Sequence, residues 1–188
     1  MDSVSPHKWC LALSALLIMI VAGIFVLVLL ALGLADPPLA GTLRWQSASV
    51  EGWLPVRCTG ESEMFIAPIR IPRPPFTVVA SASNHGEAHS AWGLWLETVE
   101  GIQMFQVSNE GYLSVSSDDS THWAQFFHIQ SPTNKLYLHV QTDDIATFRV
   151  NDEIAWQARL TEVEGLSWGV ARYGKADLAW EYIRVYAP

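Results

Sequence analysis

Cysteine and basic residues are both scarce in this chain of 188 residues. Cys10 lies within an apolar segment near the start of the chain, Cys58 lies beyond that segment, and no CxxC or CxxCH motif is present. The sequence therefore offers no disulfide framework, no cysteine metal site and no haem attachment, and we expect no cofactor. Lysine and arginine number 11 against 19 acidic residues, which gives a net charge of −8. With no basic run, we expect no nucleic-acid partner, and anionic lipid is a poor partner.

Carboxylates at the spacing needed for glycoside cleavage are also missing. Retaining glycosidases place two acids about 5–5.5 Å apart across the bond they cleave. The nearest candidates, Glu97 and Glu100, are three positions apart and would point to opposite faces of a continuous strand. Glu110 and the pair Asp118-Asp119 lie in turns without an acidic partner. We therefore predict that the chain is not an enzyme.

No charged residue occurs between Lys8 and Asp36, and residues 9–35 are almost all apolar. This run exceeds the about 20 residues that cross a bilayer core as a helix. We predict a short cytoplasmic N-terminus over 1–8 and a single-pass transmembrane helix over 9–35 in the cell membrane. Lys8 before the run and Asp36 after it favour an extracytoplasmic C-terminal domain. Ala15 and Ala22, one heptad apart, are candidates for packing against another membrane helix.

A cleaved signal peptide is the alternative interpretation of this segment. Gly33-Leu34-Ala35 has the small residues of a cleavage site. A signal peptide, however, has an apolar core of only about 7–15 residues and a more basic start. The length of the run therefore favours an uncleaved anchor.

The remainder of the chain has the pattern of a β-protein. Short runs rich in β-branched and aromatic residues alternate with turn residues, and Leu136, Leu138 and Val140 show a clear period of two. We predict strands over Met64–Ile71, Phe76–Ser83, Ala91–Thr98, Ile102–Ser108, Tyr112–Ser116, Ala124–Ile129, Lys135–Gln141, Ala146–Val150, Glu153–Gln157, Ser167–Tyr173 and Ala179–Tyr186. Many short antiparallel strands predict an all-β sandwich, jelly roll or barrel. We expect a linker and first strands over 36–62 and the sandwich over 63–188.

One loop gathers side chains that bind metals. His85, Glu87 and His89 are close in sequence, and imidazole with carboxylate can hold zinc if the loop folds back. The sequence places no further ligand group near them, so a polar surface loop is the simpler interpretation. Calcium at the loop acids, such as Asp118 and Asp143, is a further alternative.

Tryptophan is abundant, with nine residues. Most are expected in the core, but exposed indoles can stack on sugars or anchor a protein interface. Trp92 and Trp95 lie on opposite faces of one predicted strand, so we expect one in the core and the other partly exposed. These two are the candidate ligand or interface residues.

Six short motifs follow one another in the last half of the chain. They are Ala91–Leu96, Met104–Val115, Asn134–Leu138, Phe148–Ile154, Gly169–Ala171 and Glu181–Tyr186. In this order, over roughly residues 76–187, they resemble the concanavalin A-like (laminin-G-like) jelly-roll domains. Asp152 stands where that family usually has glycine, although Asn-Asp also forms tight turns. The resemblance implies the jelly-roll fold and leaves activity open, since the fold hosts lectins, glycosidases and adhesion modules.

Three functions compete on this basis. The first is a non-catalytic accessory subunit that contacts other integral membrane subunits through helix and sandwich, for instance in a respiratory or photosynthetic complex. The second is a surface carbohydrate-binding module, which requires exposed aromatic residues on a shared face. The third is a glycoside-directed hydrolase, which requires two close carboxylates. The missing acid pair and the predicted anchor favour the first.

Overall fold

The computed structural model describes residues 6–31, 37–59, 62–117, 122–160 and 167–188. Within these ranges, the side chains of 6–12, 29–31, 57–59 and 117 lie outside the description. The chain divides into two compact units, Met1–Pro38 and Leu39–Pro188. The first contains helix α1 (Pro6–Ala31), and the second contains all the strands.

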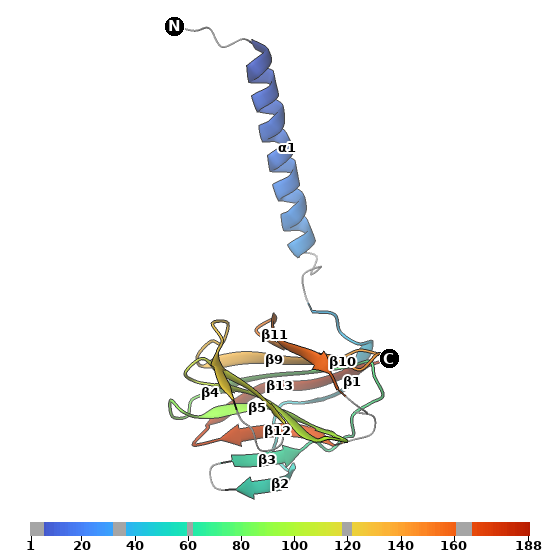
Figure 1. The fold of residues 1–188 in the computed structure, drawn as a ribbon, viewed down its shortest axis with the longest axis vertical. Helices are drawn as coiled ribbons and strands as arrows, with labels where there is room; N and C mark the ends of the chain where they lie inside the picture. The colour runs from blue at the N-terminus through green and yellow to red at the C-terminus, as the bar shows by residue number, and fades with distance from the viewer. Residues whose placement is uncertain (1–5, 32–36, 60–61, 118–121, 161–166) are drawn as a thin grey trace. The chain divides into compact units, whose positions relative to one another are not determined.

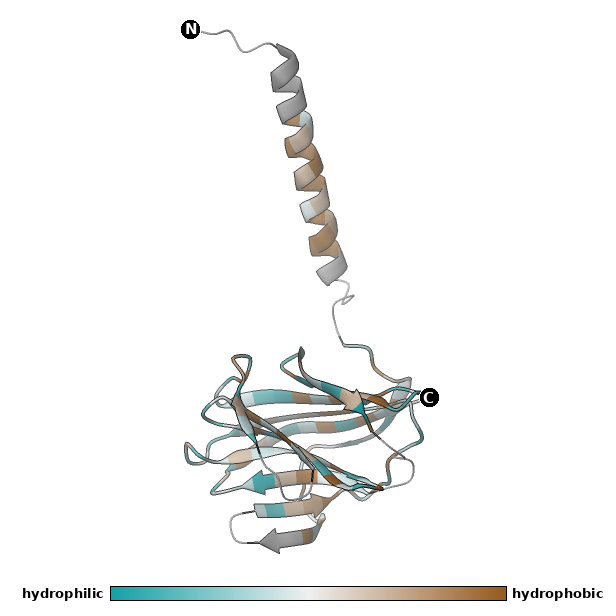
Figure 2. Ribbon diagram, viewed as in Figure 1, coloured by the Kyte–Doolittle hydropathy of each residue, from teal (hydrophilic) through white to brown (hydrophobic). Residues whose placement is uncertain are grey.

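The described part of α1 does not support the predicted membrane anchor. Its described side chains cover residues 13–28, all of them exposed and most of them apolar (Figure 2). Among the described residues, no helix is both long enough and apolar enough to cross a membrane. The predicted single-pass anchor over 9–35 and the membrane localisation are corrected accordingly.

Two antiparallel sheets form the second unit (Figure 1). The six-stranded sheet has the order β1-β13-β4-β9-β10-β11. Its strands are β1 (Thr42–Ser47), β13 (Leu178–Ala187), β4 (Phe76–Asn84), β9 (Thr133–Val140), β10 (Ile145–Val150) and β11 (Glu153–Arg159). The seven-stranded sheet has the order β2-β3-β12-β5-β6-β7-β8. Its strands are β2 (Leu54–Thr59), β3 (Ser62–Ile66), β12 (Trp168–Tyr173), β5 (Ala91–Thr98), β6 (Gly101–Ser108), β7 (Tyr112–Ser117) and β8 (Trp123–Gln125).

The main core lies between the two sheets, where alternate residues of each strand meet. Phe105 on β6 and Phe148 on β10 are fully buried, with ring centroids 4.9 Å apart. Trp168 on β12 packs edge-on against Trp45 on β1, with centroids 6.1 Å apart, and so joins one sheet to the other. The predicted all-β antiparallel sandwich is confirmed by this arrangement.

Local turn chemistry explains the hairpin between β10 and β11. Asn151 and Asp152 have φ angles of 50° and 72°, which are the left-handed angles that a two-residue hairpin turn requires. The Asn151 side chain also accepts a hydrogen bond from the Lys135 backbone N–H at 2.8 Å. The Asn-Asp pair therefore forms the tight turn that the sequence predicts.

Thr77 and His139, which lie side by side on the six-stranded sheet, lead to a prediction about how stability depends on pH. Thr77 Oγ1 accepts a hydrogen bond from the backbone N–H of Ala40 at 3.0 Å and lies 2.9 Å from His139 Nδ1. Desolvation by burial, with the nearby Arg149 charge, holds the pKa of His139 below its ordinary 6.5. The unfolded chain therefore binds a proton at His139 more readily than the folded chain does.

We expect the free energy of unfolding to fall as the pH is lowered from about 6.5 through the folded-state pKa of His139. His139→Gln, which cannot be protonated, should show a smaller loss between pH 7 and pH 5. Urea unfolding at several pH values measures both. If the free energy of unfolding changes equally with pH in the two proteins, His139 does not couple folding to pH.

Candidate functional site

A hollow with three partly exposed aromatic rings lies on the outer face of the seven-stranded sheet. Its volume is about 340 Å³. The rings are those of Tyr112 (40% exposed), Trp123 (40%) and Tyr173 (39%). The other lining residues are polar: His89, Ser108 and Glu110. An apolar ring surface beside hydrogen-bonding groups is the usual composition of a small-molecule site.

Strand alternation places these side chains on one face. Leu113 on β7 points into the core, so its neighbours Tyr112 and Ser114 point outward. Trp123 on β8 is the cross-strand partner of Ser114 and therefore shares its face. Tyr173 on β12 pairs with Ala91 on β5, which in turn pairs with Ser108 on β6. The register thus brings residues from β6, β7, β8 and β12 to one end of this face.

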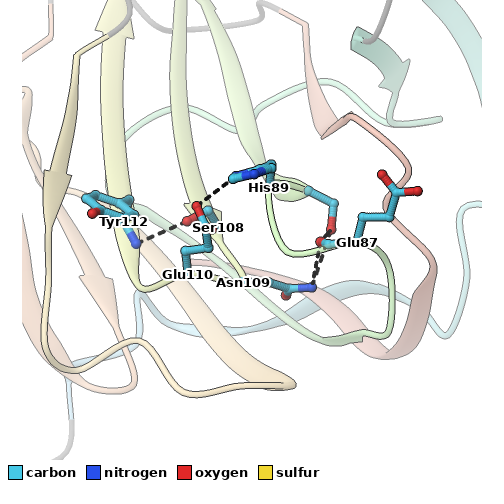
Figure 3. A network of polar contacts seen from close by, with 7 residues as sticks. Glu87, His89, Ser108, Asn109, Glu110 and Tyr112 are labelled. Atoms are coloured by element: carbon cyan, nitrogen blue, oxygen red, sulfur yellow. Dashed lines mark hydrogen bonds and ion pairs between the residues drawn. The ribbon is translucent and has the colours of Figure 1, made fainter.

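A polar network borders the hollow (Figure 3). His89 Nδ1 lies 2.9 Å from Glu110 Oε2, and the two side chains are 87% and 38% exposed. Ser108 Oγ accepts a hydrogen bond from the backbone N–H of Tyr112 at 3.1 Å. These contacts fix the turn between β6 and β7 and leave donors and acceptors at the edge of the hollow.

Two buried polar side chains, together with the half-buried Asn109, hold the surrounding loops together. Asn84 Nδ2 donates to Ser90 Oγ at 3.0 Å, and Asn109 Nδ2 lies 3.3 Å from the same oxygen. Asn84 Oδ1 accepts from the backbone N–H groups of Gly86 at 3.0 Å and Asp177 at 3.2 Å. Asn84 and Ser90 are 2% and 1% exposed. The β4–β5 loop, the β6–β7 turn and the β12–β13 connection are therefore tied to one another.

A second hollow of about 610 Å³ borders on the first. It shares His89 and Tyr173 with the aromatic hollow. Its charged side chains form two ion pairs, Arg172 with Glu63 and Lys175 with Glu87. The two hollows therefore meet at His89 and at Tyr173, the last residue of β12.

The predicted metal candidates do not converge. His85, Glu87 and His89 are all exposed. The Glu87 carboxylate pairs with Lys175 at 2.7 Å, and Figure 3 shows it pointing away from His89, which pairs with Glu110 instead. Within the described ranges, no three metal-binding side chains lie close enough together to hold an ion. Asp118 of the calcium alternative lies outside the described residues.

Because these side chains turn to different partners, we expect Zn²⁺ to leave the thermal unfolding midpoint unchanged. A bound ion stabilises the folded state in proportion to its concentration over Kd, so calorimetry with and without excess Zn²⁺ tests this. His89→Ala is the control variant. A rise in the midpoint that this substitution removes would restore the zinc interpretation.

The prediction that Trp92 or Trp95 is partly exposed is wrong. Trp92 is 1% exposed and lies in the main core against Trp180, while Trp95 is 2% exposed on the outer face. Trp95 is the cross-strand partner of Gly169, where a Cβ atom would lie 2.8 Å from the indole nitrogen. The indole therefore fills the space above a glycine, and its Nε1–H donates to Phe65 O at 3.1 Å. Neither ring is available to a ligand.

The packing role predicted for Ala15 and Ala22 falls with the membrane anchor. Both residues are exposed on α1. Glu97, considered above as an acid, has a structural role instead. It accepts a hydrogen bond from the Ser167 backbone N–H at 2.9 Å, and this bond holds its pKa below the ordinary 4.5.

Sequence reasoning did not single out Tyr112, Trp123 or Tyr173. The alternation around Leu113 and Val115 places Tyr112 outside the core, and this pattern is the sequence signal that could have identified Tyr112 as a surface residue. The convergence of Tyr173 with Tyr112 depends on β12 pairing with β5, two strands far apart in the sequence. Only the sheet order reveals it.

Comparison with known proteins supports the fold. No protein-family model and no curated protein matches the chain. The carbohydrate-binding module CBM66 from Bacillus subtilis is 11% identical, with a TM-score of 0.51, over 80% of this chain and 100% of that one. The metal-free carbohydrate recognition domain of Emp46p is 11% identical, with a TM-score of 0.54, over 77% and 87%. Apo Crh5 transglycosylase is 8% identical, with a TM-score of 0.54, over 81% and 88%.

These likenesses confirm the concanavalin A-like jelly-roll sandwich and correct two predictions about function. The prediction that the chain is not an enzyme is corrected: the structures with the same fold include a transglycosylase, so the fold does not exclude catalysis. The accessory subunit of a membrane complex finds no support, because its anchor is not upheld and the similar structures include carbohydrate-binding domains. At such low identities the fold is shared, and function has to be argued from the site.

Proposed function

We propose that residues 39–188 form a carbohydrate-binding domain whose site is the aromatic hollow. The observation that carries the proposal is the gathering of Tyr112, Trp123 and Tyr173 around one hollow of about 340 Å³. Tyrosine and tryptophan offer a flat apolar ring with a polar edge. A pyranose has the complementary form, an apolar C–H face rimmed by hydroxyl groups.

The polar rim supplies the directional contacts that a sugar requires. The Glu110 carboxylate accepts hydrogen bonds, and the His89 imidazole is 87% exposed. The Ser108 hydroxyl accepts from the Tyr112 backbone N–H and keeps its own proton to donate. Hydrogen bonds to charged groups are the stronger kind. The similar structures named as carbohydrate-binding add support at the level of the fold.

A glycan array probed with the full chain tests the proposal. We expect at least one class of saccharide to bind, with the signal lowered in Tyr173→Ala. The control is Phe127→Ala, since Phe127 is 86% exposed and does not line the hollow. If no saccharide binds, or if both variants lose the signal equally, the proposal fails.

Glycan cleavage is a second candidate, favoured by one observation. Two carboxylates, Glu63 and Glu87, line the charged hollow beside the aromatic one. Glycosidases act through a pair of carboxyl groups that flank the bond they cleave. Chromatography of the bound saccharide after long incubation tests this, and cleavage lost in both Glu63→Gln and Glu87→Gln would assign it to this hollow.

A further inference from the structure

The charged hollow lies where a second sugar unit would follow the first. It borders on the aromatic hollow through His89 and Tyr173, and its volume of about 610 Å³ is within the usual range for ligand sites. Arg172 and Tyr173 are neighbours at the end of β12, and the two hollows meet there. This inference rests on the carbohydrate-binding function proposed above.

The lining of this hollow sets donors directly beside acceptors. Arg172 Nε donates to Glu63 Oε2, and the guanidinium also lies over the Phe65 ring, 5.4 Å from its centroid. Lys175 Nζ donates to Glu87 Oε1 at 2.7 Å. All four charged side chains are between 38% and 80% exposed, so each still presents atoms to solvent.

Adjacent donors and acceptors match the vicinal hydroxyl groups of a sugar. One hydroxyl can donate to a carboxylate while its neighbour accepts from a guanidinium or ammonium group. Both bonds are charge-assisted and hence stronger than bonds between neutral groups. Exposed ion pairs contribute little to stability, so their rearrangement toward a ligand costs little.

The balance of charge selects among sugars. Two acids and two bases line the hollow, so a neutral unit meets no net charge there. An acidic sugar would meet the same balanced lining but would be repelled by the net charge of −8 on the chain. We infer that the charged hollow is a second subsite, and that the ligand is a neutral oligosaccharide of two or more units.

Calorimetric titration of the full chain with saccharides of one to four units tests this inference. The probes are neutral gluco-, manno-, galacto- and fructo-oligosaccharides, with oligogalacturonides as the acidic series. We expect the affinity to rise about tenfold or more from one unit to three for a neutral series, the equivalent of about 1.4 kcal/mol. Arg172→Gln and Glu87→Gln should each remove most of that rise.

A matched control is Lys135→Gln, which breaks a similarly exposed ion pair with Asp152 on the other sheet and should keep the rise. Thermal unfolding will show whether Arg172→Gln still folds. If it does not, Glu87→Gln keeps the test valid, because Glu87 lies in an exposed loop. Binding that does not depend on length overturns the subsite while the proposed function stands. Tighter binding of the acidic series overturns the assignment to neutral sugars, and no binding at any length overturns both proposals.

Discussion

Trp123→Ala is expected to weaken saccharide binding about tenfold or more while leaving the fold intact. The indole is 40% exposed at the edge of the aromatic hollow and supplies its largest ring. Stacking of a flat ligand on an aromatic side chain is worth about 1–3 kcal/mol by alanine substitution, as measured for nucleic-acid bases. Each 1.4 kcal/mol is about a factor of ten in Kd. Calorimetric titration with the saccharide that the array identifies measures the change.

Two comparisons make this result specific. Phe127→Ala removes a ring that is 86% exposed and outside the hollow, so its Kd should match that of the unmodified chain. Circular dichroism should show the same sheet content in all three proteins, since β8 is a three-residue edge strand. An unchanged Kd in Trp123→Ala would remove the aromatic hollow from the account.

Trp168→Ala is expected to lower the free energy of unfolding by about 3–5 kcal/mol, the usual cost of truncating a buried aromatic ring. Its ring is 2% exposed and packs against Trp45 and Trp53, with centroids 6.1 Å away in each case. Its Nε1–H also donates to Ile69 O at 3.0 Å, so truncation leaves that carbonyl without its partner. Urea unfolding followed by fluorescence gives the difference.

The matched control for this prediction is Trp123→Ala, the same substitution at a half-exposed position. We expect it to change the free energy of unfolding by less than about 1 kcal/mol, as is common for surface substitutions. A cost for Trp168→Ala below about 1 kcal/mol would mean that the contact between the sheets is not as the structure shows it.

The fold was largely predictable because its signals are local. Strand β5 (Ala91–Thr98) has the predicted bounds, and the Asn151-Asp152 turn follows from backbone preferences of those two residues. Strand β8 ends at Gln125 rather than Ile129, because its pairing with β7 runs out at Tyr112. The end of β8 is therefore set by the length of its partner strand β7, and the residues of β8 alone do not reveal it.

The candidate site was less predictable because it depends on pairing between distant strands. A period-two pattern places Trp92 and Trp95 on opposite faces but does not say what covers each face. Trp95 is buried because Gly169, far away in the sequence, lies opposite it. Trp123 gave no signal of its own, since its exposure follows from the edge position of β8. Whether a side chain on the outer face of a sheet is buried thus depends on which residues of the neighbouring strands lie opposite it.

The most direct test of the central claim follows the tryptophan indole N–H signals by NMR while the full chain is titrated with the saccharide found on the array. The chain has nine tryptophans, and single substitutions assign the signals. The account predicts that the Trp123 signal shifts most, while those of the buried Trp92 and Trp95 stay near their free positions. Saccharide binding that leaves the Trp123 signal unmoved would contradict the account and place the site elsewhere.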